Sequence, residues 1–198
     1  MASIDTLVED ISKILRSEGP KLSVDQLGEQ LGRMGVNVAR SLNKALIRND
    51  ASVRSDPKVI YASEFGNKCL RQLFYKHKHP ELAEGIHAAA RFKFFYGDIV
   101  EEAMLALAEV AGHTVEDRQK RIELPATNGY KVTGRIDAVI DGVVVDVKSV
   151  STIGFREFQV GLGGRKFGYA DQLALYAMAE KKKDKGHFLI STKVHGIA

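Results

Sequence analysis

Residues 134–150 read GRIDAVIDGVVVDVKSV and place charged side chains inside two apolar runs that have the composition of buried β-strands. The runs flank Asp141-Gly142, and an aspartate–glycine pair between β-rich segments is typical of a two-residue hairpin loop. In the register set by such a loop, Asp137 lies directly opposite Asp146. Ionised groups are rarely buried unless they are paired or hold a metal, so this hairpin is the first candidate for a functional site.

Alternation along the two predicted strands sorts their side chains onto two faces. Lys148 lies two residues beyond Asp146 and therefore joins both carboxylates on one face. Arg135 falls opposite Lys148 in the same register, which would turn it toward a substrate on that face. The other face carries the residues expected to enter the core: Ile136, Val145 and Val147.

Two carboxylates directly opposite each other destabilise a solvated sheet by roughly 0.2–1 kcal/mol. A divalent cation between them reverses that effect, and a site with few side-chain oxygen ligands suits Mg²⁺ or Mn²⁺. A lysine beside the cation can orient an attacking water, help to deprotonate it, or stabilise negative charge on a phosphate, which is the chemistry of phosphodiester hydrolysis. The alternative is an Asp–Lys ion pair on the exposed face of an ordinary hairpin.

The composition of the 198-residue chain, 44% hydrophobic and 27% charged, is that of an ordinary globular protein. We expect no membrane association, because no apolar run is long enough to span a bilayer and the N-terminus lacks the pattern of a secretory signal. The single cysteine excludes an internal disulfide and favours a cytoplasmic location. A net charge of +4 permits nucleic-acid binding without requiring it.

Residues 1–50 are predicted to be all-helical, with three short helices over 3–19, 23–35 and 37–50. A glycine between the last two helices raises the possibility of a helix-turn-helix. The favoured interpretation is a small helical cap on the main domain, since no base-reading face is evident. Residues 51–58 read as a linker.

The rest of the chain mixes helices and strands. We expect helices over 63–78, 85–112 and 169–186, and strands over 114–124, 129–140, 143–150 and 187–192. This order predicts an α/β fold with a mixed sheet on which helices pack.

The spacing of GRID, eight intervening residues and DVK resembles the core motif of the PD-(D/E)XK nuclease superfamily. Three further segments in the expected order resemble its RecB-like branch. They are SEFGNKCLRQLFY, GDIVEEAM and YADQLALY. The resemblance covers about residues 60–192 and implies a restriction-endonuclease-like mixed central sheet flanked by helices. It divides the chain into an N-terminal helical region, 1–50, and a nuclease domain, 51–198.

The resemblance also assigns a metal site. It implies that the carboxylates of Asp137 and Asp146 and the carbonyl of Val147 bind Mg²⁺ or Mn²⁺, and that Lys148 is the catalytic lysine. The helix ligand falls on Glu101, where many RecB-like members have histidine. The adjacent Glu102 is the alternative ligand. For both glutamates, the non-functional alternative is that they lie in the solvated first turns of a helix, where the helix dipole favours negative charge.

Further roles follow from the helix that resembles the Q-x3-Y motif. Gln172 would support catalysis, and Tyr176 lies one turn further on the same face. The residues implied or expected to contact DNA are Ser63, Arg71, Arg135, Arg165, Lys166, Tyr169 and Tyr176, with packing, surface ion pairs and a solvated loop as the alternatives. Iron–sulfur members of the branch use four cysteines, so this chain is expected to carry no cluster and to bury Cys69 as a small hydrophobic residue.

These features together favour a Mg²⁺- or Mn²⁺-dependent DNA exonuclease that acts in recombination, repair or phage DNA processing. The alternatives are a structure-specific DNA endonuclease and a non-catalytic DNA-binding protein that uses residues 1–50. The expected partner is DNA, and a single-strand-binding or annealing protein is a further candidate. The expected location is the cytoplasm of a bacterial cell or phage-infected host, and the oligomeric state is open.

Overall fold

The computed structural model describes residues 2–19, 23–47, 56–66, 69–161, 168–181, 185–192 and 196–197. Its helices are α1 (Leu7–Leu15), α2 (Val24–Ile47), α3 (Leu70–Lys78), α4 (Ala88–Val110), α5 (Thr152–Gln159) and α6 (Tyr169–Ala179). Its strands are β1 (Val59–Tyr61), β2 (Val115–Glu116), β3 (Arg121–Pro125), β4 (Lys131–Arg135), β5 (Ala138–Ile140), β6 (Val143–Val150), β7 (Gly186–Thr192) and β8 (Gly196–Ile197). The predicted mixed α/β class is confirmed.

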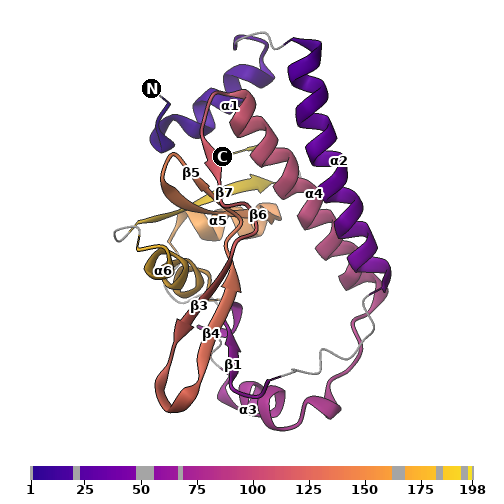
Figure 1. Cartoon of the computed structure of the whole chain (residues 1–198), viewed down its shortest axis with the longest axis vertical. Helices are drawn as coiled ribbons and strands as arrows, with labels where there is room; N and C mark the ends of the chain where they lie inside the picture. Colours follow the sequence, from indigo (N-terminus) through magenta and orange to yellow (C-terminus); the bar gives the residue numbers. More distant parts are fainter. Residues whose placement is uncertain are drawn as a thin grey trace.

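The strands form two sheets that meet where β4 gives way to β5 (Figure 1). The larger sheet has the order β2-β5-β6-β7-β8, in which β6 and β7 are parallel, and the smaller has the order β1-β4-β3. Helix α4 covers one side of the larger sheet and α6 the other (Figure 1). Within the described ranges, no helix combines the length and apolarity needed to cross a membrane.

The hairpin between β5 and β6 has the predicted register. Ile140 pairs with Val143, and the loop residues Asp141 and Gly142 have φ angles of 49° and 81°. Two successive positive φ values are typical of a type I′ turn, whose twist matches that of the flanking strands. The aspartate–glycine pair therefore determines the register of this hairpin.

The predicted strand over 129–140 is interrupted at Ile136 and Asp137. There the chain leaves the smaller sheet and enters the larger one. The neighbouring strand, predicted over 114–124, is divided at the same level into β2 and β3. The backbone stays satisfied at the break, because Gln119 N donates to Asp137 O and Ile136 N donates to Lys120 O. Two adjacent strands thus change sheets together.

This break overturns two predictions. Arg135 does not lie opposite Lys148, because Arg135 pairs with Arg121 of β3 and Lys148 pairs with Ile190 of β7. Ile136 is buried as expected, but it packs on the α6 side, whereas Val145 and Val147 pack on the α4 side. A register extrapolated from the hairpin loop holds only while both strands stay in one sheet.

Each side of the larger sheet carries an apolar cluster. The α4 side gathers Leu7, Ile11, Met104, Leu105, Ala108, Ala138, Ile140, Val145, Val147 and Leu189. The α6 side gathers Ala62, Ile122, Val132, Ile136, Val139, Val144, Leu173 and Tyr176. The two clusters hold α4 and α6 in place on the sheet, and these helices carry the remaining candidate site residues.

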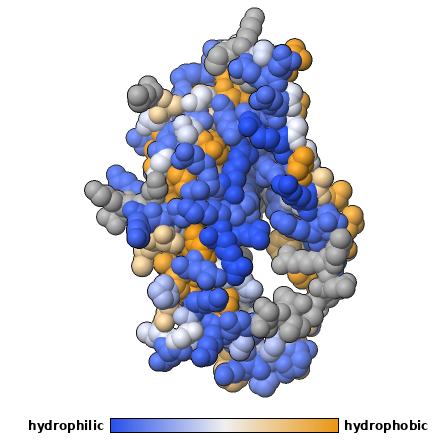
Figure 2. Space-filling view, in the orientation of Figure 1, coloured by the Kyte–Doolittle hydropathy of each residue, from blue (hydrophilic) through white to orange (hydrophobic). Residues whose placement is uncertain are grey.

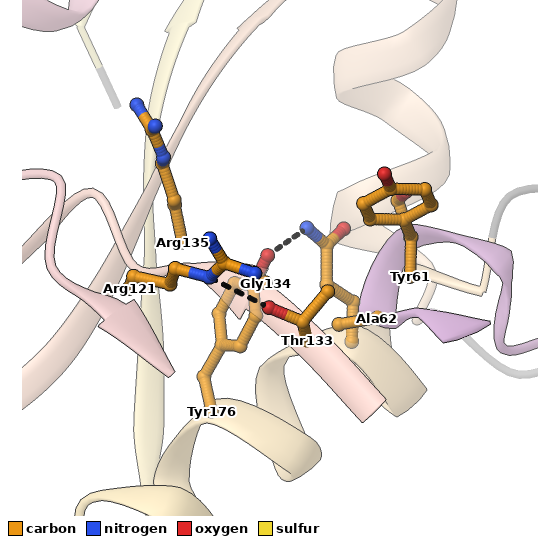
Figure 3. A pocket seen from close by; sticks show the side chains of 9 residues that line it. Tyr61, Ala62, Arg121, Thr133, Gly134, Arg135 and Tyr176 are labelled. Carbon is orange, nitrogen blue, oxygen red and sulfur yellow. Dashed lines mark hydrogen bonds between the residues drawn. The ribbon is translucent and has the colours of Figure 1, made fainter. Parts of the chain in front are cut away.

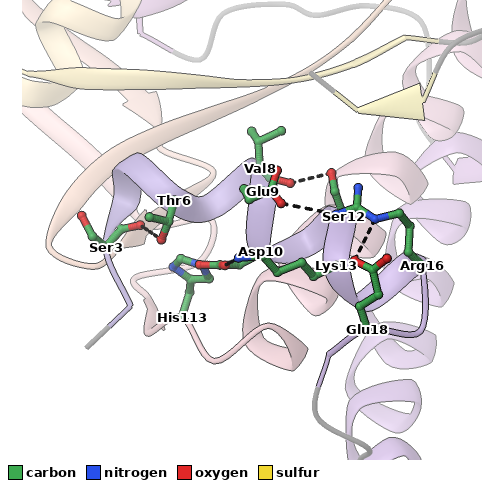
Figure 4. Close-up of polar contacts among 10 residues, drawn as sticks. All are labelled: Ser3, Thr6, Val8, Glu9, Asp10, Ser12, Lys13, Arg16, Glu18 and His113. Atoms are coloured by element: carbon green, nitrogen blue, oxygen red, sulfur yellow. Dashed lines mark hydrogen bonds and ion pairs between the residues drawn. The ribbon is translucent and has the colours of Figure 1, made fainter.

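The N-terminal helices differ from their prediction. Helix α2 runs unbroken through Gly35 and lies along α4 (Figure 1), so the break required for a helix-turn-helix does not occur. Helix α1 packs into the core through Leu7 and Ile11. His113 also connects α1 to the hairpin loop, because its Nδ1 lies 2.7 Å from Asp141 Oδ2 and its Nε2 lies 3.6 Å from Asp10 Oδ2. Figure 4 shows His113 beside Asp10.

Two other local predictions need correction. The helix expected over 63–78 begins at Leu70 and is preceded by a 3₁₀ turn over Ala62–Glu64. Cys69, expected to be buried, is exposed, because it stands before the first turn of α3 and outside both apolar clusters. The short strand β1 and the helix α5 were not expected. Each is too short to show a clear hydrophobic period.

Candidate active site

Charged residues from three separate segments come together at the break between the sheets. Glu101 comes from α4, Asp137 from the turn between β4 and β5, and Asp146 and Lys148 from β6. Helix α4 packs against β6, and the charges of Glu101 and Asp146 both act on Asp137. The structure therefore brings together the four residues at the centre of the predicted site.

Asp146 and Lys148 form a buried ion pair. The Nζ atom of Lys148 lies 2.6 Å from Asp146 Oδ2, and the Asp146 side chain is only 2% exposed. Burial raises the pKa of Asp146, and the positive charge of Lys148 only partly opposes this effect. Burial by itself lowers the pKa of Lys148, but the charges of Asp146 and Asp137 outweigh it, so the net pKa is raised and the ammonium is retained at neutral pH.

Asp137 lies beside the backbone of β6. The backbone N–H of Val147 donates to Asp137 Oδ2 at 2.7 Å, so residue 147 is directly adjacent to this carboxylate, as the predicted ligand set requires. The pKa of Asp137 is raised well above its ordinary value, first by burial and then by the negative charges of Glu101 and Asp146. Ionising all three carboxylates at once is therefore costly without a compensating cation.

The structure distinguishes the two adjacent glutamates of α4. Gln119 Nε2 donates to Glu101 Oε1 at 2.6 Å, while burial, followed by the nearby carboxylates, raises the pKa of Glu101 to about 7. Glu102 instead accepts hydrogen bonds from Asn37 at 3.0 Å and from Arg118 at 3.4 Å. Glu101 thus belongs to the carboxylate cluster, and Glu102 ties α4 to α2 and to the segment before β3. No sequence pattern had pointed to Gln119.

The cluster fits a divalent cation by the chemistry of its donors. Burial raises the pKa of all three carboxylates, and the charge of Asp146 adds to this effect at Glu101 and Asp137. Within the described residues, the buried Oδ2 of Asp146 receives no well-aligned hydrogen bond. Carboxylate oxygens are the donors that Mg²⁺ and Mn²⁺ prefer. Among the residues that the structure describes, no three such groups stand close enough to hold an ion together, and each carboxylate of the cluster contacts a protein group instead. A cation would therefore have to displace some of these contacts.

A pocket of about 430 Å³ is lined by residues of α6, the smaller sheet and the 3₁₀ turn before α3 (Figure 3). Gln172 Nε2 donates to Tyr176 Oη at 2.7 Å, and both residues line the pocket. Tyr176 is buried and fits against Gly134, where an added Cβ would lie 2.7 Å from Tyr176 Cε1. Both predicted residues of α6 therefore line one wall of this pocket.

Two arginines line another wall of the pocket. Arg121 and Arg135 are direct cross-strand partners in β3 and β4 (Figure 3), and Ser63 lines the same space. Like charges directly opposite each other are unfavourable, so a bound anion would relieve their repulsion. Arg135 was predicted with the wrong register but reaches the pocket from β4. Arg121 was not predicted, because only the pairing of β3 with β4 brings it there.

The remaining predicted DNA contacts are spread more widely. The ring of Tyr169 stacks on Phe158 at 5.7 Å between centroids, and Lys148 Nζ lies 5.3 Å from its centre, so protein groups already contact it. Arg71 is exposed on α3, with its guanidinium 5.8 Å from the ring of Tyr75. Arg165 and Lys166 lie outside the described residues.

Comparisons with known proteins bear on the fold of this chain and not on the chemistry of the candidate site. No family model matches the chain, and no curated protein matches it. Among solved structures, that of SSO0001 is similar, with a TM-score of 0.51 and 20% sequence identity over 83% of this chain and 73% of that chain. At this level of identity the likeness establishes a common fold alone.

Proposed function

We propose that this chain is a Mg²⁺- or Mn²⁺-dependent DNA exonuclease of the PD-(D/E)XK superfamily, RecB-like branch, that acts in recombination, repair or phage DNA processing. The supporting observation is the cluster of Glu101, Asp137 and Asp146 around Lys148. Three carboxylates from three segments are held where burial raises the pKa of each, and neighbouring negative charges raise the pKa of Glu101 and Asp137 further. Such an arrangement lowers the stability of the metal-free fold, and a bound cation would offset the cost of ionising the buried carboxylates.

Glu101, Asp137 and Asp146 would hold the metal, with the carbonyl of Val147 as a further ligand. When bound, Mg²⁺ or Mn²⁺ supplies a Lewis acid for the phosphate and lowers the pKa of a water. The Val147 N–H keeps Asp137 oriented, and Gln119 does the same for Glu101. The chain thus provides both the ligands and the groups that hold them in place.

Lys148 would act as a positive charge beside the scissile phosphate. Its pKa is raised by the neighbouring carboxylates, so the side chain remains an ammonium at neutral pH. An ammonium can orient an attacking water and stabilise the negative charge that develops on phosphate, but it cannot accept a proton. We therefore assign charge stabilisation, rather than general-base catalysis, to Lys148.

The adjoining pocket would position the DNA strand. Arg121 and Arg135 offer guanidinium groups to backbone phosphates, and Ser63, Gln172 and Tyr176 offer polar groups beside them. These contacts read the phosphate backbone rather than base edges, which suits an enzyme that degrades DNA irrespective of sequence.

The test is digestion of end-labelled linear DNA beside covalently closed circular DNA, in Mg²⁺, Mn²⁺ or EDTA. We expect shortening of linear DNA from an end, survival of circles, and loss of activity in EDTA and in Lys148→Ala. Lys13→Ala is the matched control, because Lys13 is exposed on α1 and pairs with Asp10 away from the cluster. Cleavage of circular DNA would mean that the protein is an endonuclease rather than an exonuclease. DNA binding without cleavage in any metal would refute the assignment of nuclease activity.

A further inference from the structure

A further pocket, of about 230 Å³, lies between the end of α2 and the start of α4. The two helices pack side by side, and Figure 1 shows these two helix ends next to each other. The walls of the pocket combine apolar side chains, among them Phe94 and Phe95, with the cations Lys44 and Arg91. Figure 2 shows hydrophobic side chains at the surface where these helix ends lie. The pocket has no part in holding the metal ligands.

Phe94 is an aromatic residue of this lining that is not part of the core. It is 56% exposed, and among the described residues it belongs to neither apolar cluster. Phe94 and Glu101 are seven residues apart, which places them within about 20° of the same direction around α4. Further along this face, Leu105 and Ala108 pack into the core. Phe94 therefore shares a helix face with the candidate metal ligand but stays exposed.

The pocket adjoins the carboxylate cluster. Asp98 lines it and lies one helical turn before Glu101, and the charge of Asp98 acts on Glu101. The rise of the helix places Phe94 about 10 Å from Glu101 along the axis, which is about three nucleotides of a stacked strand. The pocket of the smaller sheet adjoins the cluster as well, because Arg135 is two residues before Asp137. A DNA strand that crosses the cluster is thus within reach of both pockets.

An aromatic ring beside cations is the combination that binds unpaired nucleotides. The ring offers its face to a base, while Lys44 and Arg91 offer positive charge to a phosphate. Arg91 Nε donates to Ile86 O at 3.1 Å, so the arginine side chain is held in place, whereas Lys44 approaches from the other helix. A base inside a duplex is stacked on both faces and must leave the helix before a side chain can stack on it. The lining therefore favours a single strand over a duplex.

We propose that this pocket binds an unpaired nucleotide of DNA, with the base stacked on Phe94 and the phosphate held by Lys44 and Arg91. The proposal rests on the assignment of the protein as a DNA nuclease, and it adds the substrate class: a single strand, or the single-stranded end of a duplex. Stacking does not depend on the identity of the base, because every base has a π face. A fully paired duplex offers no free base to the ring and binds more weakly.

The first test uses tryptophan fluorescence. The chain contains no tryptophan, so Phe94→Trp introduces a single reporter at the pocket and keeps an aromatic ring there. Its fluorescence is expected to be quenched by single-stranded oligothymidylate in EDTA. Phe92→Trp is the matched control, because Phe92 is 67% exposed and points about 160° away from Phe94 around α4. Equal quenching of both variants, or of neither at saturating DNA, would overturn the proposal.

The second test is fluorescence anisotropy of a labelled single strand and of a blunt duplex of the same length, again in EDTA. Phe94→Ala should bind the single strand roughly 5- to 150-fold more weakly, Phe94→Tyr should keep most of the affinity, and Phe92→Ala should change it little. Lys44→Ala should lower the salt dependence of single-strand binding. Duplex binding should be weaker and unaffected by Phe94→Ala. Single-strand affinity that does not change in Phe94→Ala would overturn the proposal.

These measurements distinguish failure of the pocket from failure of the nuclease assignment, because binding in EDTA does not require cleavage. If the wild type cleaves DNA but Phe94→Ala binds single strands as the wild type does, the nuclease stands and the pocket assignment fails. If binding depends on Phe94 but no metal supports cleavage, the pocket assignment stands and the nuclease fails.

Discussion

Replacing Glu101 with glutamine is expected to stabilise the metal-free protein above pH 7. The pKa of Glu101 is raised from an ordinary 4.5 to about 7, mainly by burial and then by neighbouring carboxylates. The folded state therefore binds a proton more tightly than the unfolded chain does. As the pH rises from 4.5 to 7, the folded protein must give up that proton at a cost, and stability is lost.

The magnitude follows from the two pKa values. The difference between 4.5 and about 7, at about 1.36 kcal/mol for each pKa unit, corresponds to at most about 3.4 kcal/mol of unfolding free energy. Glutamine has a similar shape, stays neutral, and can still accept the hydrogen bond from Gln119. The unfolding free energy of the Glu101→Gln variant should therefore lack this part of the pH dependence.

The assay is urea unfolding in EDTA at several pH values between 5 and 8. Wild type and Glu101→Gln should nearly coincide at pH 5 and separate progressively toward pH 8, with the variant more stable. Added Mn²⁺ should then stabilise the wild type more than the variant, because the variant lacks a carboxylate ligand. Parallel stability curves, or a variant that is less stable at pH 8, would refute this reasoning.

Glu102→Gln is the matched control at the next residue. Glu102 holds Arg118 and Asn37 rather than facing the carboxylate cluster. Its replacement removes the charge from a largely buried ion pair and should destabilise the protein by about 1–3 kcal/mol at neutral pH. Stabilisation of this variant would mean that the two glutamates have exchanged roles.

Three other outcomes are expected. Gly134→Ala should destabilise the fold by about 1–3 kcal/mol in thermal unfolding, because its Cβ would crowd Tyr176. Gly142→Ala should cost about 1 kcal/mol through its φ of 81° alone, since no atom of the described residues lies within 4 Å of an added Cβ. A larger loss would indicate a steric contact at this position. Arg121→Ala and Arg135→Ala should each weaken DNA binding in EDTA and lower the dependence of affinity on salt concentration, as measured by fluorescence anisotropy. An unchanged salt dependence would mean that the replaced arginine does not contact a DNA phosphate.

Local sequence patterns were sufficient for the central hairpin and for the spacing along α6. Asp141-Gly142 adopts the positive φ angles that the pair favours, and the register follows by counting outward from the loop. Gln172 and Tyr176 are four residues apart, so any helix over them places both on one face. Such features depend on residues that are close together in the sequence, so they can be predicted from the sequence alone.

Other features depended on which distant segments pack together. The break at Ile136 and Asp137, the entry of Arg121 into the pocket and the continuity of α2 through Gly35 all result from contacts between segments far apart in sequence. A helical glycine weakens a helix by less than packing along its length can restore, so Gly35 does not end α2.

The sequence by itself determined the mixed α/β class, the hairpin and the types of residue that gather around it, because periodicity and turn chemistry act locally. Only the tertiary structure decided that Glu101 rather than Glu102 joins Asp137 and Asp146, since adjacent residues on a helix point about 100° apart and the packing of α4 selects one of them. It likewise decided which arginines share the pocket, because the pairing of β3 with β4 is a long-range choice made by burial.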